Sequence, residues 1–475
     1  MTTTLSHTSV NVDGWCEAVD RLAGGSLTLL SLWADPPDVK MALLDEAKGD
    51  ISILSYACRN GQYPTVGVKH PPAIRLERAI RDLHRLEAIG ASDTRPWLLH
   101  TAAPYEFLAA EGEALHQIAV GPVHAGIIEP GHFRFTANGE YLVRLEQRLG
   151  YVHKGIEGLM TGATLDTAAK LAARTSGDST VAYGFAFALA AEAALKIAAP
   201  PRAVYLRALM AELERLANHF SDIGAICNDA SFSLMHAQCG ILRELTLRTA
   251  EACFGQRLMM DIIVPGGVAR DIAADGAAAL RGLLAEVRRV FPSLIELYDN
   301  TASLQDRTVT TGIVKPEYAR QFGAGGFVGR ASGRNVDARR LPGYAPYDAL
   351  AFEVPVLTAG DVNARVWIRI REVEQSLSLV DQLLGALPDG SIRVDVPSRG
   401  GEGLSGEGLG IVEAFRGDVL VWLRLDDQGR AARCHLRDAS WFQWPLLETA
   451  VEGNIVADFP LCNKSFNCSY AGHDL

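Results

Sequence analysis

The segment Arg174–Phe187, RTSGDSTVAYGFAF, joins a polar turn to the start of a small, apolar, helix-forming run. Ser176 and Ser179 stand three residues apart, which is the spacing of a CxxC metal clamp. Two thiolates at these positions would form half of a soft-metal site, but neutral hydroxyls hold such a metal poorly. An ordinary helix start explains the same residues, because Ser176 or Asp178 can cap the first N–H groups. Both interpretations stay open on this segment alone.

Composition narrows the classes of protein to which the chain can belong. It has 475 residues, of which 48% are hydrophobic and 21% are charged, so more than one ordinary globular domain is expected. The net charge of −11 argues against a nucleic-acid binder, which needs clustered Lys and Arg. The eight cysteines form no CxxC pair and indicate free thiols in a reducing compartment. Neither a secretory signal nor a membrane-spanning apolar run is predicted.

The first hundred residues predict a small α/β domain. Strands are expected at Leu27–Leu32 and Ile51–Cys58, where β-forming residues lie between polar turns. A helix is expected to begin after Pro71-Pro72, since proline suits the first helical turn. Its apolar stripe is expected to stop at Gly90, a typical helix-ending residue.

A larger unit is expected at residues 117–475, after a linker at residues 101–116. It opens with a β-hairpin, because His132–Phe135 and Tyr141–Leu145 alternate in polarity around an Asn-Gly turn. Helical periodicity then predicts a bundle of long helices at Arg202–Ile226, Leu234–Leu258, Gly276–Phe291 and Asn363–Leu387. The fold class is therefore α+β, with a small α/β domain followed by a mainly helical domain.

Longer motifs resemble a known family. Residues 63–100 resemble the end of the small hydrophilic subunit of respiratory complex I, a domain that braces its neighbours and binds no cofactor. GPVHAGIIEPGHFRF at 121–135 and RLGYVHKGIEGLM at 148–160 resemble the large subunit of formate hydrogenlyase-type nickel–iron hydrogenases. The quinone-site subunit of complex I shares this region. Formate hydrogenlyase-type large subunits fuse the two units in this order, so the resemblance covers essentially the whole chain.

Three further segments bear on this resemblance. The E-x-x-R-x-x-N-H pattern at residues 212–219 matches the family, although a polar helix face explains these residues as well. Ile411–Arg424, which contains Glu413 and Arg416, resembles the E-A-x-R-G segment that supports the hydrogenase metal site. Gly323–Asp348 lacks G-x-x-x-x-G-K-[ST], so no nucleotide site is predicted there.

The resemblance also locates the metal ligands of the hydrogenases. Residue-by-residue matching puts the four expected thiolates at Ser176, Ser179, Ser469 and Gly472. All four thiolates are therefore missing. Because soft thiolates select such a metal centre, no nickel–iron site is expected in this chain.

A cavity like the quinone site of complex I is what the resemblance then implies. His124 and His132 are candidates for the family's histidine on the first hairpin loop, and Tyr183 for a displaced tyrosine. Arg416 and the four former ligand positions are expected to line this cavity. Asp178, a carboxylate in the ancestral metal position, is a candidate for proton transfer or conformational coupling.

The resemblance implies a core subunit of a membrane-associated, energy-converting oxidoreductase complex, peripheral at the cytoplasmic face of the inner membrane. Expected partners are a small iron–sulfur subunit and antiporter-like membrane-arm subunits, with a quinone as candidate ligand. The chain has no clustered cysteines for iron–sulfur ligation, so the cluster belongs to the partner and no cofactor is assigned to this chain. Two alternatives stay open: a formate hydrogenlyase-type hydrogenase subunit, and a non-redox coupling or scaffold subunit for ion or substrate transport.

Overall fold

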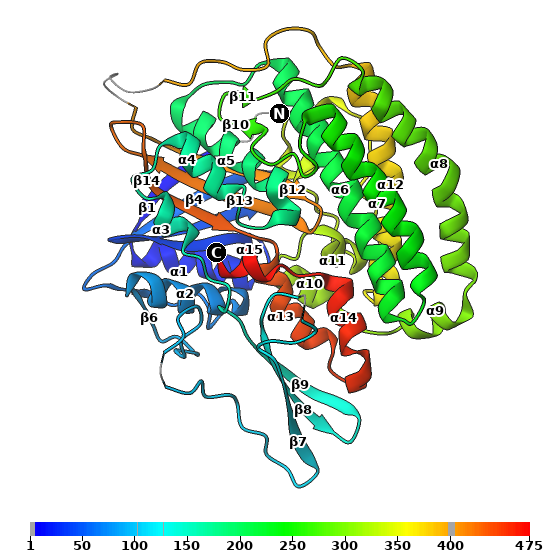
Figure 1. The fold of residues 1–475 in the computed structure, drawn as a ribbon. Coiled ribbons are helices and arrows are strands. Elements are labelled where there is room, and N and C mark those ends of the chain that lie inside the picture. Colours follow the sequence, from blue (N-terminus) through cyan, green and yellow to red (C-terminus); the bar gives the residue numbers. More distant parts are fainter. Residues whose placement is uncertain (1–4, 102, 127, 398–403) are drawn as a thin grey trace.

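The computed structural model describes residues 5–101, 103–126, 128–397 and 404–475. Its N-terminal part is a four-stranded sheet against which two helices pack (Figure 1). The strand order is β1-β4-β3-β2, with β1 parallel to β4 and the other pairs antiparallel. These elements are β1 (Leu5–Val10), β2 (Thr28–Asp35), β3 (Asp38–Asp45), β4 (Asp50–Ala57), α1 (Val12–Ala23) and α2 (Ile74–His84).

The two strands predicted in this part are confirmed as β2 and β4, whereas β1 and β3 were not predicted. The predicted helix is confirmed as α2, but its expected end at Gly90 is wrong. The helix ends at His84 because Arg85 adopts a left-handed conformation, and its N–H donates to Arg81 O. The segment from Glu87 to Ile89 instead forms β6, which pairs with β5 (Gln62–Pro64).

The predicted hairpin is confirmed as β8 (His132–Asn138) and β9 (Tyr141–Arg148). A third strand, β7 (Leu115–Val120), pairs with β8 and begins inside the predicted linker. The three antiparallel strands project from the body of the molecule at the bottom of Figure 1. The inner residues of the hairpin, such as Phe133 and Phe135, pack against Phe459 near the C-terminus.

Four long helices pack together on the right of Figure 1, as predicted. They are α6 (Pro201–Asp229), α7 (Ser233–Phe254), α8 (Gly276–Asn300) and α12 (Val362–Gly385). The expected end of the third helix at Phe291 is wrong, because α8 continues through Pro292 for more than two further turns. The Val264–Val268 break between α7 and α8 contains the two-residue strands β10 (Ile263–Val264) and β11 (Gly267–Val268).

A second sheet lies between the bundle and the N-terminal sheet (Figure 1). It consists of β12 (Gly406–Ala414), β13 (Gly417–Leu425) and β14 (Ala431–Arg437), all antiparallel. Helix α5 (Thr180–Leu195) packs on it so closely that a Cβ at Gly408 or Gly410 would lie 1.9 or 2.0 Å from a helix carbonyl oxygen. On the opposite side, Trp422 contacts Trp33 of β2 with ring centroids 5.5 Å apart. The two sheets therefore share a buried core.

Short helices complete the fold and position the C-terminus. The last three are α13 (Ser440–Ala450), α14 (Phe459–Phe466) and α15 (Tyr470–Asp474). The others are α3 (Ile156–Met160), α4 (Leu165–Ala172), α9 (Ala302–Thr308), α10 (Pro316–Gln321) and α11 (Gly326–Ala331). Among the described ranges, no helix combines the length and apolarity needed to cross a bilayer.

Candidate functional site

Three segments that are far apart in sequence meet at the start of α5. They are the turn Ser176–Ser179, the connection between β12 and β13, and the residues that lead into α15. Ser176 Oγ lies 3.1 Å from Ser469 Oγ, and Gly472 N donates to Ser469 Oγ over 2.8 Å. The three serines are buried, with exposed fractions of 6% or less. The structure thus brings together the four predicted ligand positions. These four residues, Asp178 and Arg416 are called the serine cluster below.

An ion pair between Arg416 and Asp178 lies within the serine cluster. The guanidinium donates from Nη1 to Asp178 Oδ1 over 2.9 Å and from Nη2 to Oδ2 over 2.5 Å. Such bidentate pairs are the strongest carboxylate interactions in proteins. Ser176 Oγ donates to Oδ1 over 2.6 Å, and Arg416 also donates to Ser179 Oγ and Asn467 O. The two charged groups therefore neutralise each other, and Ser176, Ser179 and Asn467 provide their further hydrogen bonds.

The ion pair also fixes the protonation state of the carboxyl group. Burial would raise the pKa of Asp178, but the charge of Arg416 and its hydrogen bonds lower that pKa to about 2. Asp178 is therefore ionised at neutral pH. Its side chain is 38% exposed, whereas that of Arg416 is 4% exposed. The carboxylate is thus the part of the cluster that reaches the molecular surface.

The residues of the serine cluster do not suit a thiolate-held metal. The hydroxyls of Ser176, Ser179 and Ser469 are engaged with Asp178, Arg416 and the N–H of Gly472, and neutral hydroxyls hold a soft metal poorly. Gly472 has no side chain, and a Cβ there would lie 2.6 Å from Asp438 Oδ2. Burial raises the pKa of the nearby Cys468 thiol far above its usual range, so that thiol stays protonated. Across the described residues, no group of three His, Cys, Asp or Glu side chains could hold a metal ion.

The predicted capping of α5 by Ser176 or Asp178 is wrong, since neither side chain accepts from the first turn of the helix. Glu214 of α6 takes this role, because its carboxylate accepts from Val181 N over 2.7 Å and from Ala182 N over 3.1 Å. Burial raises the pKa of Glu214 to about 8, although the two N–H donors oppose this shift. A buried acid that titrates near neutral pH therefore lies beside the serine cluster.

Asn218 connects Glu214 with Asp178. Its Nδ2 donates to Asp178 O over 2.8 Å and to Glu214 O over 2.9 Å. Glu214 was not predicted from the sequence, although it lies next to the E-x-x-R-x-x-N-H residues of α6. No sequence pattern distinguishes it from the other charged residues of α6, and only its burial in the structure, which requires specific partners, identifies it.

The interpretation of the E-x-x-R-x-x-N-H residues as an exposed polar face is wrong. Glu212, Arg215 and His219 are each at most 1% exposed. Glu212 accepts hydrogen bonds from Arg339, Tyr347 and Ser376 over 2.6–3.0 Å. His219 Nε2 lies 2.7 Å from Glu372 Oε2, and Arg330 donates to the same carboxyl group. These charges are paired inside the protein, which a solvated helix face would not require.

The other predicted site residues lie at different distances from the serine cluster. Tyr183 is fully buried and donates to Asp438 Oδ2 over 2.9 Å, so it lies behind Gly472. His124 reaches the cluster's edge through Tyr470, whose hydroxyl is 3.5 Å from His124 Nε2. His132 instead contacts Gly121 O and the Phe107 ring, and its described contacts do not include the serine cluster.

Comparison with known proteins identifies the family. The model of the family described as respiratory-chain NADH dehydrogenase, 49 kDa subunit, matches residues 231–402 and 398–474. Formate hydrogenlyase subunit 5 of Escherichia coli K12 is 31% identical over 444 residues, covering 87% of this chain and 77% of that protein. The chain belongs to the 49 kDa subunit family. The resemblance inferred from the sequence motifs is thereby confirmed.

A second relative and a solved structure support this assignment and the fold, respectively. The corresponding NADH-quinone oxidoreductase subunit of Desulfotalea psychrophila is 32% identical, covering 71% of this chain and 91% of that protein. A chain of the membrane-bound sulfane sulfur reductase, an archaeal respiratory membrane complex, has the same fold. It aligns with a TM-score of 0.72 and 24% identity over 77% of this chain and all of its own length. This similarity confirms that the fold mixes helices and sheets, as predicted.

Proposed function

We propose that this chain is the core subunit of a membrane-associated oxidoreductase complex in which an ion pair has replaced the nickel–iron centre. The observation that carries the proposal is the convergence of Ser176, Ser179, Ser469 and Gly472 around Arg416 and Asp178. The relatives include hydrogenase and NADH-quinone oxidoreductase subunits, so the same fold supports both chemistries. A hydrogenase with an aberrant site is disfavoured, because hydroxyls and a glycine stand where thiolates would be needed to hold a soft metal.

Coupling to proton movement is the second part of the proposal. Asp178 was a candidate for proton transfer or conformational coupling, and its low pKa favours the coupling role. Glu214 is better suited to carry the proton, because its pKa of about 8 lies near physiological pH. A change of charge at the surface near Asp178 would then shift the protonation of Glu214. We expect the change to come from a partner that holds an iron–sulfur cluster, as the relatives' membership of respiratory complexes supports.

Proton translocation by the assembled complex tests this proposal. Glu214→Gln removes the proposed proton carrier and Asp178→Asn removes the charge that would control it, so each should reduce translocation about tenfold or more, the least that a positioned acid or base contributes. Asp261→Asn is the matched control, because Asp261 forms a bidentate pair with Arg174 outside the serine cluster. Wild-type translocation in both test variants would refute the coupling role. Unchanged electron transfer with lost translocation would support it most strongly.

Quinone binding beside the hairpin loop is a second candidate function. The contact of His124 with Tyr470 favours it, as do the exposed apolar side chains of Val123 and Ile128 in the same loop. These side chains are 80% and 45% exposed, which is typical of a surface that a partner or membrane covers. His124→Ala and Tyr470→Phe should raise the apparent KM for a soluble quinone in the intact complex. An unchanged KM in both variants, or an absence of quinone reduction in the wild type, would favour the non-redox alternative.

A further inference from the structure

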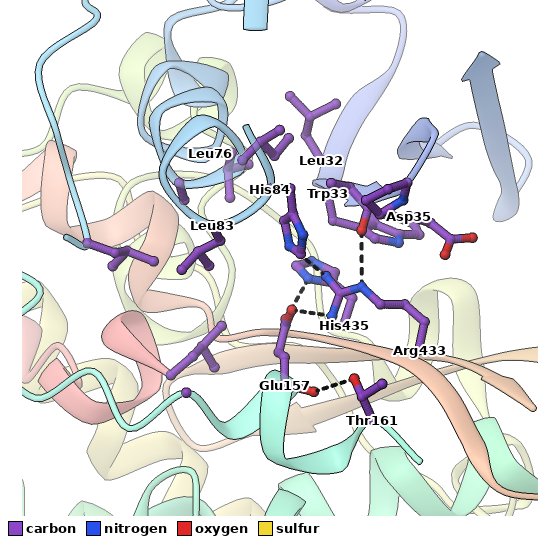
Figure 2. A pocket seen from close by; sticks show the side chains of 18 of the residues that line it. Leu32, Trp33, Asp35, Leu76, Leu83, His84, Glu157, Thr161, Arg433 and His435 are labelled. Carbon is purple, nitrogen blue, oxygen red and sulfur yellow. Dashed lines mark hydrogen bonds and ion pairs between the residues drawn. The ribbon is translucent and has the colours of Figure 1, made fainter. Parts of the chain in front are cut away.

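A cavity of about 430 Å³ lies beneath α2, between β2, α3 and β14 (Figure 2). Its volume is within the range of small-molecule sites. We call it the α2 cavity. None of its lining residues belongs to the serine cluster. Much of its wall is apolar and includes Leu32, Leu76, Ala79, Ile80, Leu83 and Trp441.

One end of the α2 cavity is polar, and its carboxylate, Glu157, is already engaged. Glu157 accepts from His435 Nδ1 over 2.8 Å and from Leu436 N over 2.9 Å. Its other oxygen lies 2.7 Å from Arg433 Nη1. Glu157 thus has little capacity left for a ligand that donates hydrogen bonds. Figure 2 shows this carboxylate pointing toward His435 and Arg433 at the polar end.

The donors at this end are not all used. Arg433 Nη2 lies 3.2 Å from His84 Nε2, and a guanidinium can only donate, so His84 Nε2 is the acceptor. Burial and the charge of Arg433 lower the pKa of His84 to about 4, so the ring is neutral with its proton on Nδ1. Among the described residues, this Nδ1–H has no hydrogen-bond partner. The Nε of Arg424, another lining residue, is buried and has no partner in the described chain.

Each of the two arginines that line the α2 cavity is paired with a carboxylate. Arg433 pairs with Glu157, and Arg424 Nη2 donates to Asp35 Oδ1 over 2.6 Å. An ionised ligand would therefore lose its hydration without gaining an unpaired counter-charge. A neutral acceptor would satisfy the spare donors at no such cost. We propose that the α2 cavity binds an uncharged, mainly apolar molecule whose carbonyl oxygen accepts a hydrogen bond from His84.

Access to the α2 cavity is through its rim. Leu83, Gly158 and Thr161 line the cavity and are solvent-exposed, whereas Leu76 and Trp441 are buried. Figure 2 shows Leu83 and Thr161 on opposite sides of the polar end. Substitution of Leu83 can therefore narrow the entrance without disturbing the core.

Benzophenone is a suitable probe, because it is uncharged, apolar and carries one carbonyl, and because light attaches it covalently to neighbouring C–H groups. Titration of the full-length chain should give saturable binding, and irradiation should label peptides that contain residues 76–84 or 158–161. His84→Leu should weaken benzophenone binding about tenfold, as expected for one hydrogen bond. The control His116→Leu, at an exposed histidine of β7, should not change it.

Two further measurements separate the parts of the proposal. Diphenylmethane, which lacks the carbonyl, should bind the wild type and His84→Leu equally well, and 4-benzoylbenzoate should bind more weakly than benzophenone. Ala79→Trp fills the cavity and Leu83→Trp narrows its rim, so each should abolish the labelling; the rim variant keeps the test valid if the first one does not fold. Absence of saturable binding, labelling elsewhere, or tighter binding of the benzoate would overturn the proposal. None of these outcomes depends on the function of the serine cluster.

Discussion

The serine cluster and the α2 cavity both place an arginine beside a carboxylate, but they differ in whether hydrogen-bonding groups around the pair are left without a partner. In the serine cluster, Arg416 donates to Asp178, Ser179 and Asn467, and the surrounding hydroxyls are engaged as well. In the α2 cavity, Arg433, His435 and Leu436 N engage the Glu157 carboxylate, whereas the His84 Nδ1–H and the buried Arg424 Nε have no partner among the described residues. A saturated site holds a fixed charge in place, whereas an unsaturated site can recognise a ligand. The predictions below test this difference, from the largest expected effect to the smallest.

Loss of the cation from the serine cluster should have the largest effect. Arg416→Met leaves Asp178 and the Asn467 carbonyl without their main partner, and breaking a buried ion pair costs about 3–5 kcal/mol. Because Asp178 is partly exposed, we expect about 3 kcal/mol in the free energy of unfolding by denaturant. Arg288→Met, which breaks the exposed pair with Asp381, should cost less than about 1 kcal/mol. Equal costs for the two variants would mean that the cluster is not a specially stabilised site.

The pH dependence of stability should identify Glu214 as the titrating acid beside the cluster. The pKa of Glu214 is about 8 in the folded protein, which is above its pKa in the unfolded chain. The stabilising contribution of Glu214 is therefore complete below the unfolded pKa and is lost as the pH rises toward the folded pKa of about 8. Between about pH 6 and pH 7.5, the wild type should therefore lose about 2 kcal/mol relative to Glu214→Gln. Unfolding curves at both values measure the change. Parallel pH profiles would show that Glu214 is already ionised in the folded protein.

Substitutions that add volume should change the stability of the serine cluster and of the α2 cavity by different, smaller amounts of unfolding free energy. Gly472→Ala would push a methyl group against Asp438, which Tyr183 and Ser440 N hold in place, and should cost about 2 kcal/mol. Ala79→Leu adds apolar volume to the α2 cavity, so stability should change by less than about 1 kcal/mol. Thermal unfolding of the two variants gives the comparison directly. A larger loss for Ala79→Leu would indicate that the cavity closes in solution.

The sequence predicted the long helices well, because their apolar positions repeat every three to four residues over many turns. It also located the serine cluster, since the motif positions at 176, 179, 469 and 472 meet in the fold. The β12–β14 sheet was not predicted as a sheet, because the alternating glycines of β12 are explained only by the close approach of α5. The assignment of residues 1–100 and 117–475 to separate domains remains a prediction.

The chemistry of the serine cluster was less predictable than its location. Asp178 was recognised from its place between the two serines, and Arg416 was expected in the same cavity, but their ion pair was not predicted, since the two residues lie 238 positions apart. Glu214 was missed because one carboxyl group among the charged residues of α6 has no distinguishing pattern in sequence. The α2 cavity could not be predicted at all, because its walls come from β2, α2, α3 and β14 and exist only once these elements pack.

Nickel content tests the replacement of the metal centre by an ion pair most directly. The intact complex, purified from cells grown with added nickel, would be analysed for nickel and for the amount of this chain. We predict a nickel content far below one atom per chain, because the hydroxyls, Gly472 and Arg416 offer no thiolate ligand. About one nickel atom per chain, retained through purification, would contradict the replacement.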